Sequence, residues 1–430
     1  MAFATERPLT WQTCTECGNE LPAYDPSVRC RRCGGLLEVR HRPPALTGLE
    51  LLDRFDERLG GYDPLDSGVW RFQEIVLPGA DDPVTHPEGN TPLLHRDHLD
   101  DWTGIEGLLL KHEGYNPTGS FKDRGMTVGV THALRINARA VACASTGNTS
   151  ASLAAYAALA GIPALVLVPA GQVAMGKLAQ TLAYGARTLL VRGDFDACLR
   201  LIEAASDRLG VYLLNSINPF RIEGQKTIVL ELLQQLGWTP PDWIVVPAGN
   251  LGNTSAFGKA LREAFSWGLI DRVPRIVAVQ AAGAAPFARG FAEGFATRYT
   301  VEADTVATAI RIGDPASWTR AVEAIEETDG LVLAVSDDAI LGAKAAVDRC
   351  GIGCEPASAA AVAGARELAE TGLIRPGDVV VAVLTGHILK DPGILLDYHR
   401  DREPAPPGAN RPEEIDASLG ALERVLSAVG

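Results

Sequence analysis

The stretch that decides the fold is Asn116-Pro117-Thr118-Gly119-Ser120-Phe121-Lys122-Asp123-Arg124-Gly125. It follows an apolar strand expected over residues 107–111 and opens a helix, for which Ser120 or Thr118 is the expected N-cap. A lysine beside a helix N-terminus can be desolvated and used as an amine nucleophile toward an aldehyde. Taken alone, a lysine in the first turn of a helix is commonly just an exposed residue.

A second segment, Ser145-Thr146-Gly147-Asn148-Thr149-Ser150-Ala151, also lies between an expected strand and an expected helix. Its hydroxyl groups and free amides form a natural cradle for a carboxylate. A well-capped turn between a strand and a helix would have the same pattern, so this segment alone leaves both interpretations open.

Two further segments follow apolar strands. The first is Pro247-Ala248-Gly249-Asn250-Leu251-Gly252-Asn253-Thr254-Ser255. Its glycines allow backbone N–H groups to approach a phosphate at a helix N-terminus. It matches neither a P-loop nor the GxGxxG fingerprint, so the Rossmann interpretation fails. In Thr385-Gly386-His387-Ile388-Leu389-Lys390-Asp391-Pro392, Thr385 comes at the carboxyl end of a strand, where open α/β sheets place ligand contacts. His387 is either catalytic or a hydrogen-bonded spectator.

Apolar runs alternate with Ala-rich helical stretches from about residue 106 to residue 385. The expected strands are 107–111, 140–144, 164–168, 187–191, 211–214, 243–246, 276–280, 331–335 and 378–384. The expected helices are 147–161, 173–184, 195–209, 221–236, 253–266, 337–350 and 357–371. This alternation predicts an α/β protein with parallel sheets. Residues 41–95 are expected to form a loop-rich, proline-containing segment that leads into the α/β region. A short helix is expected near 413–428.

The N-terminus carries two CxxC pairs, Cys14/Cys17 and Cys30/Cys33, twelve residues apart. Two such knuckles place four thiolates around one tetrahedral ion, and a segment this short needs metal to fold. With every coordination position filled by sulfur, the predicted zinc is structural and not catalytic. Four unrelated cysteines or two disulfides are the alternatives. The knuckles lie outside the other motifs, so their loss need not affect the chemistry.

Composition excludes several classes of protein. The chain has 430 residues, 39 Lys plus Arg and 53 Asp plus Glu, giving a net charge of −14. Such an acidic chain lacks the field needed to wrap a nucleic-acid backbone. No secretory signal is recognised, and the longest apolar runs are too short for a membrane span of ~20 residues. Eight cysteines are too few for a disulfide scaffold, so we expect a soluble protein of the reducing cytoplasm with no membrane partner.

Together the motifs resemble the fold-type II family of pyridoxal-phosphate (PLP) enzymes, and within it the threonine synthase family. The resemblance covers roughly residues 65–395. It rests on the segments GVWRF (68–72), GNTPLL (89–94), KHEGYNPTGSFKDRG (111–125), STGNTSAS (145–152), NPFRIEGQKT (218–227), PAGNLGN (247–253), CEPASAA (354–360) and TGHILKDP (385–392). The N-terminal CxxC pairs recur in a subset of these synthases.

The resemblance implies roles for individual residues. Lys122 would anchor the cofactor covalently and then transfer protons. The cofactor phosphate would be held by the backbone amides of Gly249, Asn250, Leu251, Gly252 and Asn253. Asn148 would bind the ring hydroxyl oxygen, and Thr385 would face the pyridine nitrogen. Ser145 and Thr149 would receive the substrate carboxylate. The substrate phosphate would go to Ser216, Arg221 and Asn215, a task suited to a guanidinium.

The implied architecture is the tryptophan synthase β-like arrangement of two αβα domains with the cofactor in the cleft between them. The expected boundaries are 1–40 for the zinc ribbon, 41–137 with 215–402 for the large domain, 138–214 for the small domain and 403–430 for a linker and short helix. The chain would be a homodimer.

The implied reaction converts O-phospho-L-homoserine and water to L-threonine and phosphate, by PLP-dependent γ-elimination and β-addition of water. The alternatives are a related PLP enzyme of the cysteate synthase or threonine/serine dehydratase type, and a zinc-ribbon adaptor with an inactive enzyme body.

Overall fold

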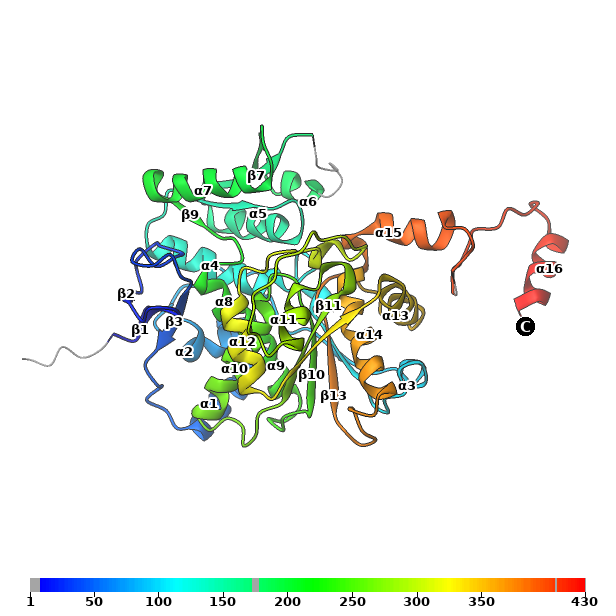
Figure 1. The fold of residues 1–430 in the computed structure, drawn as a ribbon, viewed down its shortest axis with the longest axis horizontal. Helices are drawn as coiled ribbons and strands as arrows, with labels where there is room; N and C mark the ends of the chain where they lie inside the picture. Colours follow the sequence, from blue (N-terminus) through cyan, green and yellow to red (C-terminus); the bar gives the residue numbers. More distant parts are fainter. Residues whose placement is uncertain (1–7, 172–177, 407, 430) are drawn as a thin grey trace, which may run out of the picture.

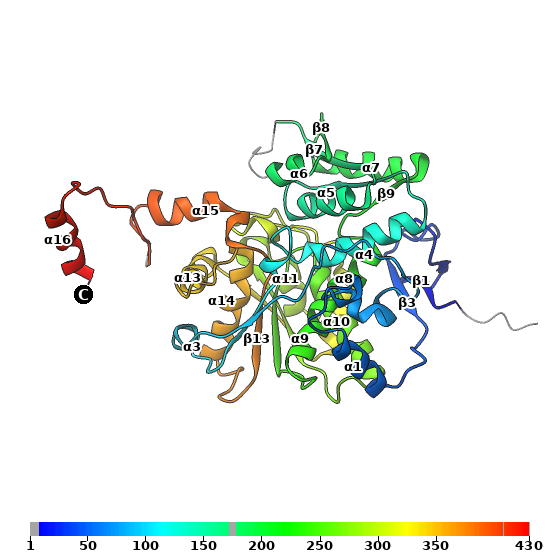
Figure 2. The same ribbon diagram turned by 180° about the vertical axis from the view of Figure 1, so that it is seen from behind.

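The computed structural model describes residues 8–171, 178–406 and 408–429, which form three separate sheets. The smallest is an antiparallel sheet of β1 (Thr10–Cys14), β2 (Glu20–Pro22) and β3 (Leu37–His41), in the order β2-β1-β3. We call residues 8–41 the ribbon. It lies beside α4 (Lys122–Arg135) and α8 (Pro219–Gln225) in both ribbon views (Figure 1, Figure 2).

The largest sheet has the strand order β12-β11-β10-β13-β5-β4. Its strands are β4 (Leu93–Leu94), β5 (Leu109–His112), β10 (Trp243–Pro247), β11 (Arg275–Ala281), β12 (Leu331–Val335) and β13 (Val380–Leu384). All neighbours pair in parallel except the edge strand β4. Alternate residues of β10 join opposite cores, Ile244 and Val246 on one face and Trp243 and Val245 on the other. A sheet buried on both faces explains the continuous apolar runs.

A second parallel sheet has the order β8-β7-β6-β9. Its strands are β6 (Ala140–Ala144), β7 (Ala164–Pro169), β8 (Arg187–Val191) and β9 (Val211–Leu213). It forms its own layer with α5 (Asn148–Ala160), α6 (Ala179–Ala183) and α7 (Phe195–Leu209), at the top of Figure 1 and Figure 2. The predicted α/β fold with parallel sheets is confirmed.

The remaining helices cover the largest sheet and extend beyond it. They are α1 (Gly48–Glu57), α2 (Gln73–Val76), α3 (Asp97–Thr103), α9 (Thr227–Gln235), α10 (Gly252–Ser266), α11 (Pro286–Ala292), α12 (Trp318–Glu327), α13 (Asp337–Arg349), α14 (Pro356–Glu370), α15 (Pro392–Leu396) and α16 (Leu419–Val429). The core on one face of the sheet contains residues of α9, α10 and α12, and the core on the other face contains residues of α13 and α14.

Every expected strand is found within a few residues, but several helix predictions were wrong. The expected helix 221–236 is two helices, α8 and α9, meeting at Lys226. The Thr227 hydroxyl donates to the Gly224 carbonyl oxygen at 2.6 Å, a side-chain bond of the kind that bends helices. Residues 41–95 are not only loop, because α1 and α2 lie there. Of the expected helix 173–184, residues 173–177 lie outside the described ranges.

The predicted N-caps of the lysine helix were also wrong. Phe121 is the N-cap of α4, and no side chain caps this helix. The backbone N–H and the hydroxyl of Thr118 both donate to the Asp123 carboxylate, each at 2.7 Å. The Thr118 hydroxyl is therefore used to fix the loop and not to accept a bond from the helix.

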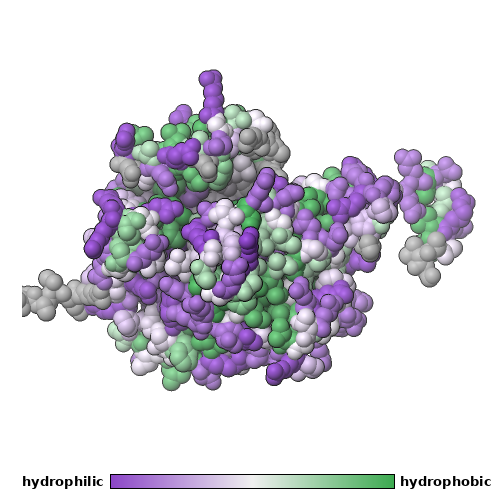
Figure 3. All heavy atoms as spheres, viewed as in Figure 1, coloured by the Kyte–Doolittle hydropathy of each residue, from purple (hydrophilic) through white to green (hydrophobic). Residues whose placement is uncertain are grey.

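The C-terminal helix α16 begins at Leu419, later than the expected residue 413, and lies on an arm away from the body (Figure 1). Leu419, Leu422 and Leu426 are exposed on it. Figure 3 shows α16 with hydrophobic residues among hydrophilic ones and apart from the rest of the surface. Over the described residues, no helix combines the length and the apolar character needed to cross a membrane.

Candidate active site

The loops that follow β5 and β13 meet directly, because these two strands are parallel neighbours in the largest sheet. Ser120 and Gly386 form an antiparallel bridge, and the Phe121 N–H donates to the Thr385 carbonyl oxygen at 3.1 Å. The His387 N–H donates to the Gly119 carbonyl oxygen at 2.9 Å. The backbone that carries Lys122 is thus fastened to the backbone that carries Thr385.

Lys122 is the first residue of α4, and its side chain is half-buried. Its Nζ lies 3.9 Å from the centre of the Phe121 ring, and no hydrogen bond joins it to any residue that the structure describes. Burial and the nearby charge of Arg221 lower the pKa of Lys122 from 10.5 to about 7, against the opposing charge of Glu355. A substantial fraction of this amine is therefore unprotonated, and nucleophilic, at neutral pH.

Asn148 and Thr385 are joined by a carboxyl group that the sequence analysis did not select. Asn148 Nδ2 donates to Glu355 Oε2 at 2.9 Å, and Thr385 Oγ1 donates to Glu355 Oε1 at 3.1 Å. Glu355 is buried, and its own N–H donates to the Gly386 carbonyl oxygen at 3.0 Å. Burial raises the pKa of this carboxyl above 4.5. Glu355 does lie in CEPASAA (354–360), one of the segments that carry the family resemblance, but nothing in that segment singled out its carboxyl group.

The glycine loop Gly249–Asn253 follows β10 and includes the first two residues of α10, and β10 is the other parallel neighbour of β13. Leu251 is left-handed, with φ of 63°, and no side chain caps α10. A Cβ at position 249 would approach the Ile310 Cα to 3.0 Å, which explains glycine there. The buried Asn253 Oδ1 has no partner among the described residues. The segment therefore ends at the uncapped N-terminus of a fifteen-residue helix, beside a buried side-chain oxygen that has no partner among the described residues.

Ser145 and Thr149 are half-buried at the N-terminus of α5, which no side chain caps. The Gly147 N–H donates to Ser145 Oγ at 3.3 Å. The Asn215 side chain bonds the backbone of Ala144 in both directions, accepting from its N–H at 3.0 Å and donating to its carbonyl at 3.1 Å. Asn215 thus fixes the end of β6, directly before Ser145.

Arg221 lies fully buried on α8. Its Nη1 donates to the Leu214 carbonyl oxygen at 3.0 Å, while Nε and Nη2 have no hydrogen-bond partner among the described residues. Burial lowers the pKa of Arg221 to about 10. Ser216, close by in the chain, is half-buried. A buried guanidinium with two unused donors is a candidate anion site.

A buried ion network lies under the lysine helix. Arg124 pairs with Glu113 at 2.7 Å and with Glu231 at 2.9 Å. Glu231 also pairs with Lys111 at 2.6 Å and with Arg71 at 2.8 Å. Together the three cations hold the pKa of Glu231 well below its usual value, although burial acts in the opposite direction. Arg124 is two residues from Lys122, so this network fixes the start of α4.

His387 is bound within its own loop, since its Nδ1 accepts a hydrogen bond from the Leu389 N–H at 3.2 Å. This contact agrees with the spectator interpretation of His387.

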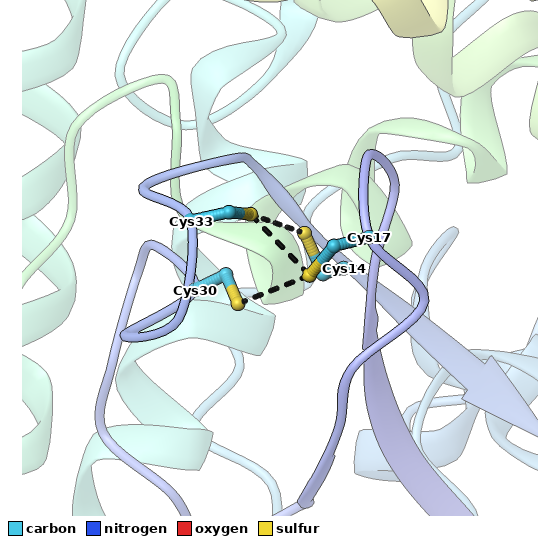
Figure 4. Close-up of side chains that lie close together, drawn as sticks. All are labelled: Cys14, Cys17, Cys30 and Cys33. Carbon is cyan, nitrogen blue, oxygen red and sulfur yellow. Dashed lines mark hydrogen bonds between the residues drawn. The ribbon is translucent and has the colours of Figure 1, made fainter.

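The four N-terminal cysteines converge, as Figure 4 shows, and their sulfur atoms lie within 4.8 Å of one another. The sulfur separations are 3.4 Å for Cys14–Cys33, 3.7 Å for Cys17–Cys30 and 3.4 Å for Cys17–Cys33. These are far longer than a disulfide bond and close to the ~3.8 Å expected for sulfurs on one tetrahedral zinc ion. The donor set therefore fits a structural metal ion.

Comparison with known proteins agrees with this geometry. Residues 84–386 match the family described as pyridoxal-phosphate dependent enzyme. A threonine synthase from Methanosarcina acetivorans is 45% identical over 96% of this chain and 98% of its own length. A threonine synthase from Mycobacterium tuberculosis is 50% identical over 79% of this chain and 93% of its own.

Among solved structures, threonine synthase from Escherichia coli has a TM-score of 0.67 and 20% identity, and the match spans 98% of this chain and all of that one (100%). This likeness supports the fold-type II arrangement of two largely parallel sheets. The chain therefore belongs to the pyridoxal-phosphate-dependent enzymes and, within that family, to the threonine synthases.

Proposed function

We propose that this chain is a lyase of threonine biosynthesis that converts O-phospho-L-homoserine and water to L-threonine and phosphate. The names of its relatives support this reaction, and one observation of its own favours a phosphorylated substrate. Arg221 is a buried cation whose Nε and Nη2 have no protein partner among the described residues. A doubly charged leaving group is the kind of ligand that such a guanidinium recognises.

The residues present fit pyridoxal phosphate. The amine of Lys122, which has no hydrogen-bond partner among the described residues, suits an aldehyde, and the glycine loop with its uncapped helix suits a phosphate. In the proposal, Gly249, Asn250, Leu251, Gly252 and Asn253 hold that phosphate through their amides. Asn148 and Thr385 bind the ring oxygen and ring nitrogen. When bound, the cofactor supplies an aldehyde that links to amines and a ring that withdraws electrons from the amino acid.

Lys122 also moves the protons. Its depressed pKa leaves Nζ able to take a proton from a substrate carbon and to give it back at neutral pH. The reaction needs proton transfers at more than one neighbouring carbon, and a single flexible amine reaches them. The ion network around Arg124 keeps the start of α4, and with it Lys122, in place.

The substrate is oriented from both ends. Ser145, Thr149 and the uncapped N-terminus of α5 receive its carboxylate. Residues 214–221, which we call the phosphate segment, receive its phosphate through Ser216 and Arg221. Asn215 was predicted to take part, and its two bonds to Ala144 favour a role in holding the phosphate segment against β6.

We also propose the domain division given by the sequence: a ribbon, a large domain of 41–137 and 215–402, a small domain of 138–214 and a C-terminal segment of 403–430. The separate four-stranded sheet supports the small domain.

The exposed leucines of α16 support a homodimer in which the arm packs on a second copy. The convergent thiols support zinc in the ribbon. All eight cysteines are free, in agreement with a cytoplasmic location.

Product analysis tests the reaction. Purified protein with pyridoxal phosphate is incubated separately with O-phosphohomoserine, O-acetylhomoserine, phosphoserine and threonine. We expect threonine and phosphate from O-phosphohomoserine alone. Ammonia and an oxo acid from threonine would indicate a dehydratase, and turnover of phosphoserine a cysteate synthase-like enzyme. A protein that stays colourless with added cofactor would indicate an adaptor with an inactive body.

A further inference from the structure

The ribbon contacts the elements that flank the phosphate segment at three independent places. The first is a buried pair: His41 Nε2, at the end of β3, lies 2.8 Å from Glu223 Oε2 on α8. Both side chains are 0% exposed. Burial lowers the pKa of His41, against the opposing effect of Glu223, which favours the neutral ring at neutral pH. Its Nδ1 then accepts from the Thr10 hydroxyl at 3.0 Å and its Nε2–H donates to Glu223.

Glu223 is two residues from Arg221 and is the centre of a buried charge cluster. Lys226 and Lys259 approach it at 2.5 and 2.8 Å. Lys259 also donates to the Val39 carbonyl oxygen in the ribbon. The orientation of α8 is therefore set by a cluster that the ribbon completes.

The second contact runs through the lysine helix. His132 of α4 donates from Nε2 to the Ala23 carbonyl oxygen of the ribbon at 2.8 Å. The His132 ring stacks on Phe220, with ring centres 3.5 Å apart and planes 15° apart. Phe220 lies directly before Arg221, so the ribbon fixes a ring that supports the residue next to the guanidinium.

The third contact is apolar. Val28 and Leu36 of the ribbon belong to one buried cluster with Leu213 and Ile217. Leu213 and Ile217 enclose Leu214, Asn215 and Ser216 in the chain. Val28 and Leu36 in turn flank the Cys30–Cys33 knuckle, where the Cys30 N–H donates to the Gly35 carbonyl oxygen at 2.8 Å. The conformation of that knuckle therefore determines where the two apolar side chains lie, and a metal ion bound by its sulfurs would fix that conformation.

We propose that the ribbon is a positioning element for the phosphate segment, so that loss of its metal or of the His41 contact weakens phosphate binding. The inference rests on the proposed function for the identity of the phosphate ligand. The four cysteines are not among the proposed site residues, so a metal ion bound there would act by holding the knuckle. This replaces the expectation, drawn from the motifs alone, that the ribbon is dispensable for the chemistry.

The test compares three forms of the holoenzyme: wild type, wild type stripped of metal by a chelator under reducing conditions, and His41→Gln. His95→Gln is the matched control, because His95 is a half-exposed histidine paired with Asp100 at 2.8 Å and distant in sequence from the ribbon. Leu36→Ala is tested beside Leu49→Ala, since Leu49 is exposed on α1. The readouts are cofactor absorbance, the dissociation constant for inorganic phosphate and hydrogen exchange of the peptide 212–226.

We expect metal removal, His41→Gln and Leu36→Ala to weaken phosphate binding about tenfold, a usual size for coupling between two sites. Exchange of 212–226 increases, the KM for O-phosphohomoserine rises more than kcat falls, and cofactor occupancy stays constant. Both control variants behave as wild type. Unchanged exchange and phosphate affinity in the stripped enzyme and in both variants would overturn the proposal.

The outcomes separate this inference from the proposed function. If the enzyme fails to convert O-phosphohomoserine while exchange of 212–226 still rises on metal removal, the reaction is wrong and the positioning role is supported. If the enzyme makes threonine, but hydrogen exchange of 212–226 and phosphate affinity do not change when the ribbon is altered, the positioning role is wrong. If His41→Gln does not fold, the stripped wild type and Leu36→Ala decide. Purified protein without metal would overturn the metal dependence and leave the two variants to decide the positioning role.

Discussion

The carboxyl group of Glu355 accepts a hydrogen bond from Asn148 Nδ2 at 2.9 Å and so joins the helix after β6 to the start of α14. Its other oxygen accepts from Thr385 at 3.1 Å. One buried carboxyl thus orients both side chains that are proposed to bind the cofactor ring.

Replacing Glu355 by alanine removes the acceptor for both donors. We expect the cofactor to bind on the order of tenfold more weakly, because a buried donor left without a partner costs about 1–3 kcal/mol. Spectroscopic titration of the apoprotein with pyridoxal phosphate measures this. Glu370→Ala, at an exposed pair with Arg366 on the same helix, is the control. Equal cofactor affinity in Glu355→Ala and wild type would contradict the assignment.

Lys122→Ala should abolish the covalent, borohydride-trappable cofactor and its visible absorption, because Lys122 Nζ is the proposed anchor. The circular dichroism spectrum should stay that of wild type. Lys344→Ala serves as the control lysine, since Lys344 is paired with Asp348 at 2.6 Å on α13. Recovery of a pyridoxyl-lysine peptide from Lys122→Ala would assign the anchor to another residue.

Labelling of the apoprotein by pyridoxal phosphate and borohydride should depend on pH with a midpoint near the Lys122 pKa of about 7. Exposed lysines gain reactivity only toward their ordinary pKa of 10.5. In Arg221→Gln the midpoint should move to higher pH, because the charge of Arg221 adds to burial in lowering the pKa of Lys122. A midpoint near 10 in the wild type would rule out a perturbed lysine.

The lowered pKa of Lys122 also determines how its contribution to the free energy of unfolding changes with pH. Between pH 7 and 10.5 the unfolded chain binds a proton at Lys122 that the folded chain has lost. The contribution of Lys122 to the free energy of unfolding of the apoprotein therefore rises with pH across this interval. Lys122→Met removes that contribution, which urea titrations at several pH values measure.

Arg221→Ala should keep the cofactor bound and coloured, yet lose turnover of O-phosphohomoserine by on the order of a hundredfold, as removal of one charge-stabilising donor does. Inorganic phosphate should compete with a phosphonate analogue in wild type and not in the variant. Arg366→Ala, at an exposed ion pair, should retain both properties. Normal turnover by Arg221→Ala would remove Arg221 from the site and weaken the choice of substrate.

Elemental analysis should find about one zinc ion per chain, because four sulfurs close enough for a single ion complete a tetrahedral site. Cys17→Ser should lose the metal, and Cys350→Ser, at a free cysteine outside the ribbon, should keep it. Metal-free protein with Cys14–Cys33 or Cys17–Cys30 disulfides after reducing purification would contradict the zinc site.

The sequence by itself determined the parallel strands of the two larger sheets and most of the long helices between them. The central strands, such as β6 and β10, are fully buried apolar runs, and burial on both faces removes any need for alternation. The loops around Lys122, Gly249 and Thr385 were recognisable because each follows such a strand. Parallel strands bring their carboxyl ends to one edge, so the loops were bound to lie near each other once β5, β13 and β10 paired. The convergence of the four cysteines was also predictable, because two CxxC pairs at this spacing are typical of a four-thiolate metal site.

Tertiary structure alone decided which distant groups meet. The sequence around Glu355 does not indicate its hydrogen bonds to Asn148 and Thr385. In the same way, the sequence around His41 does not indicate that it pairs with Glu223, 182 residues away. Lys226 interrupts the expected long helix where it is buried between Glu223 and Glu263. The free energy of a buried polar contact depends on what desolvates both partners, and that is fixed only when separate elements pack. Local patterns report which face of an element is buried, whereas the partner of each buried charge is a property of the assembled fold.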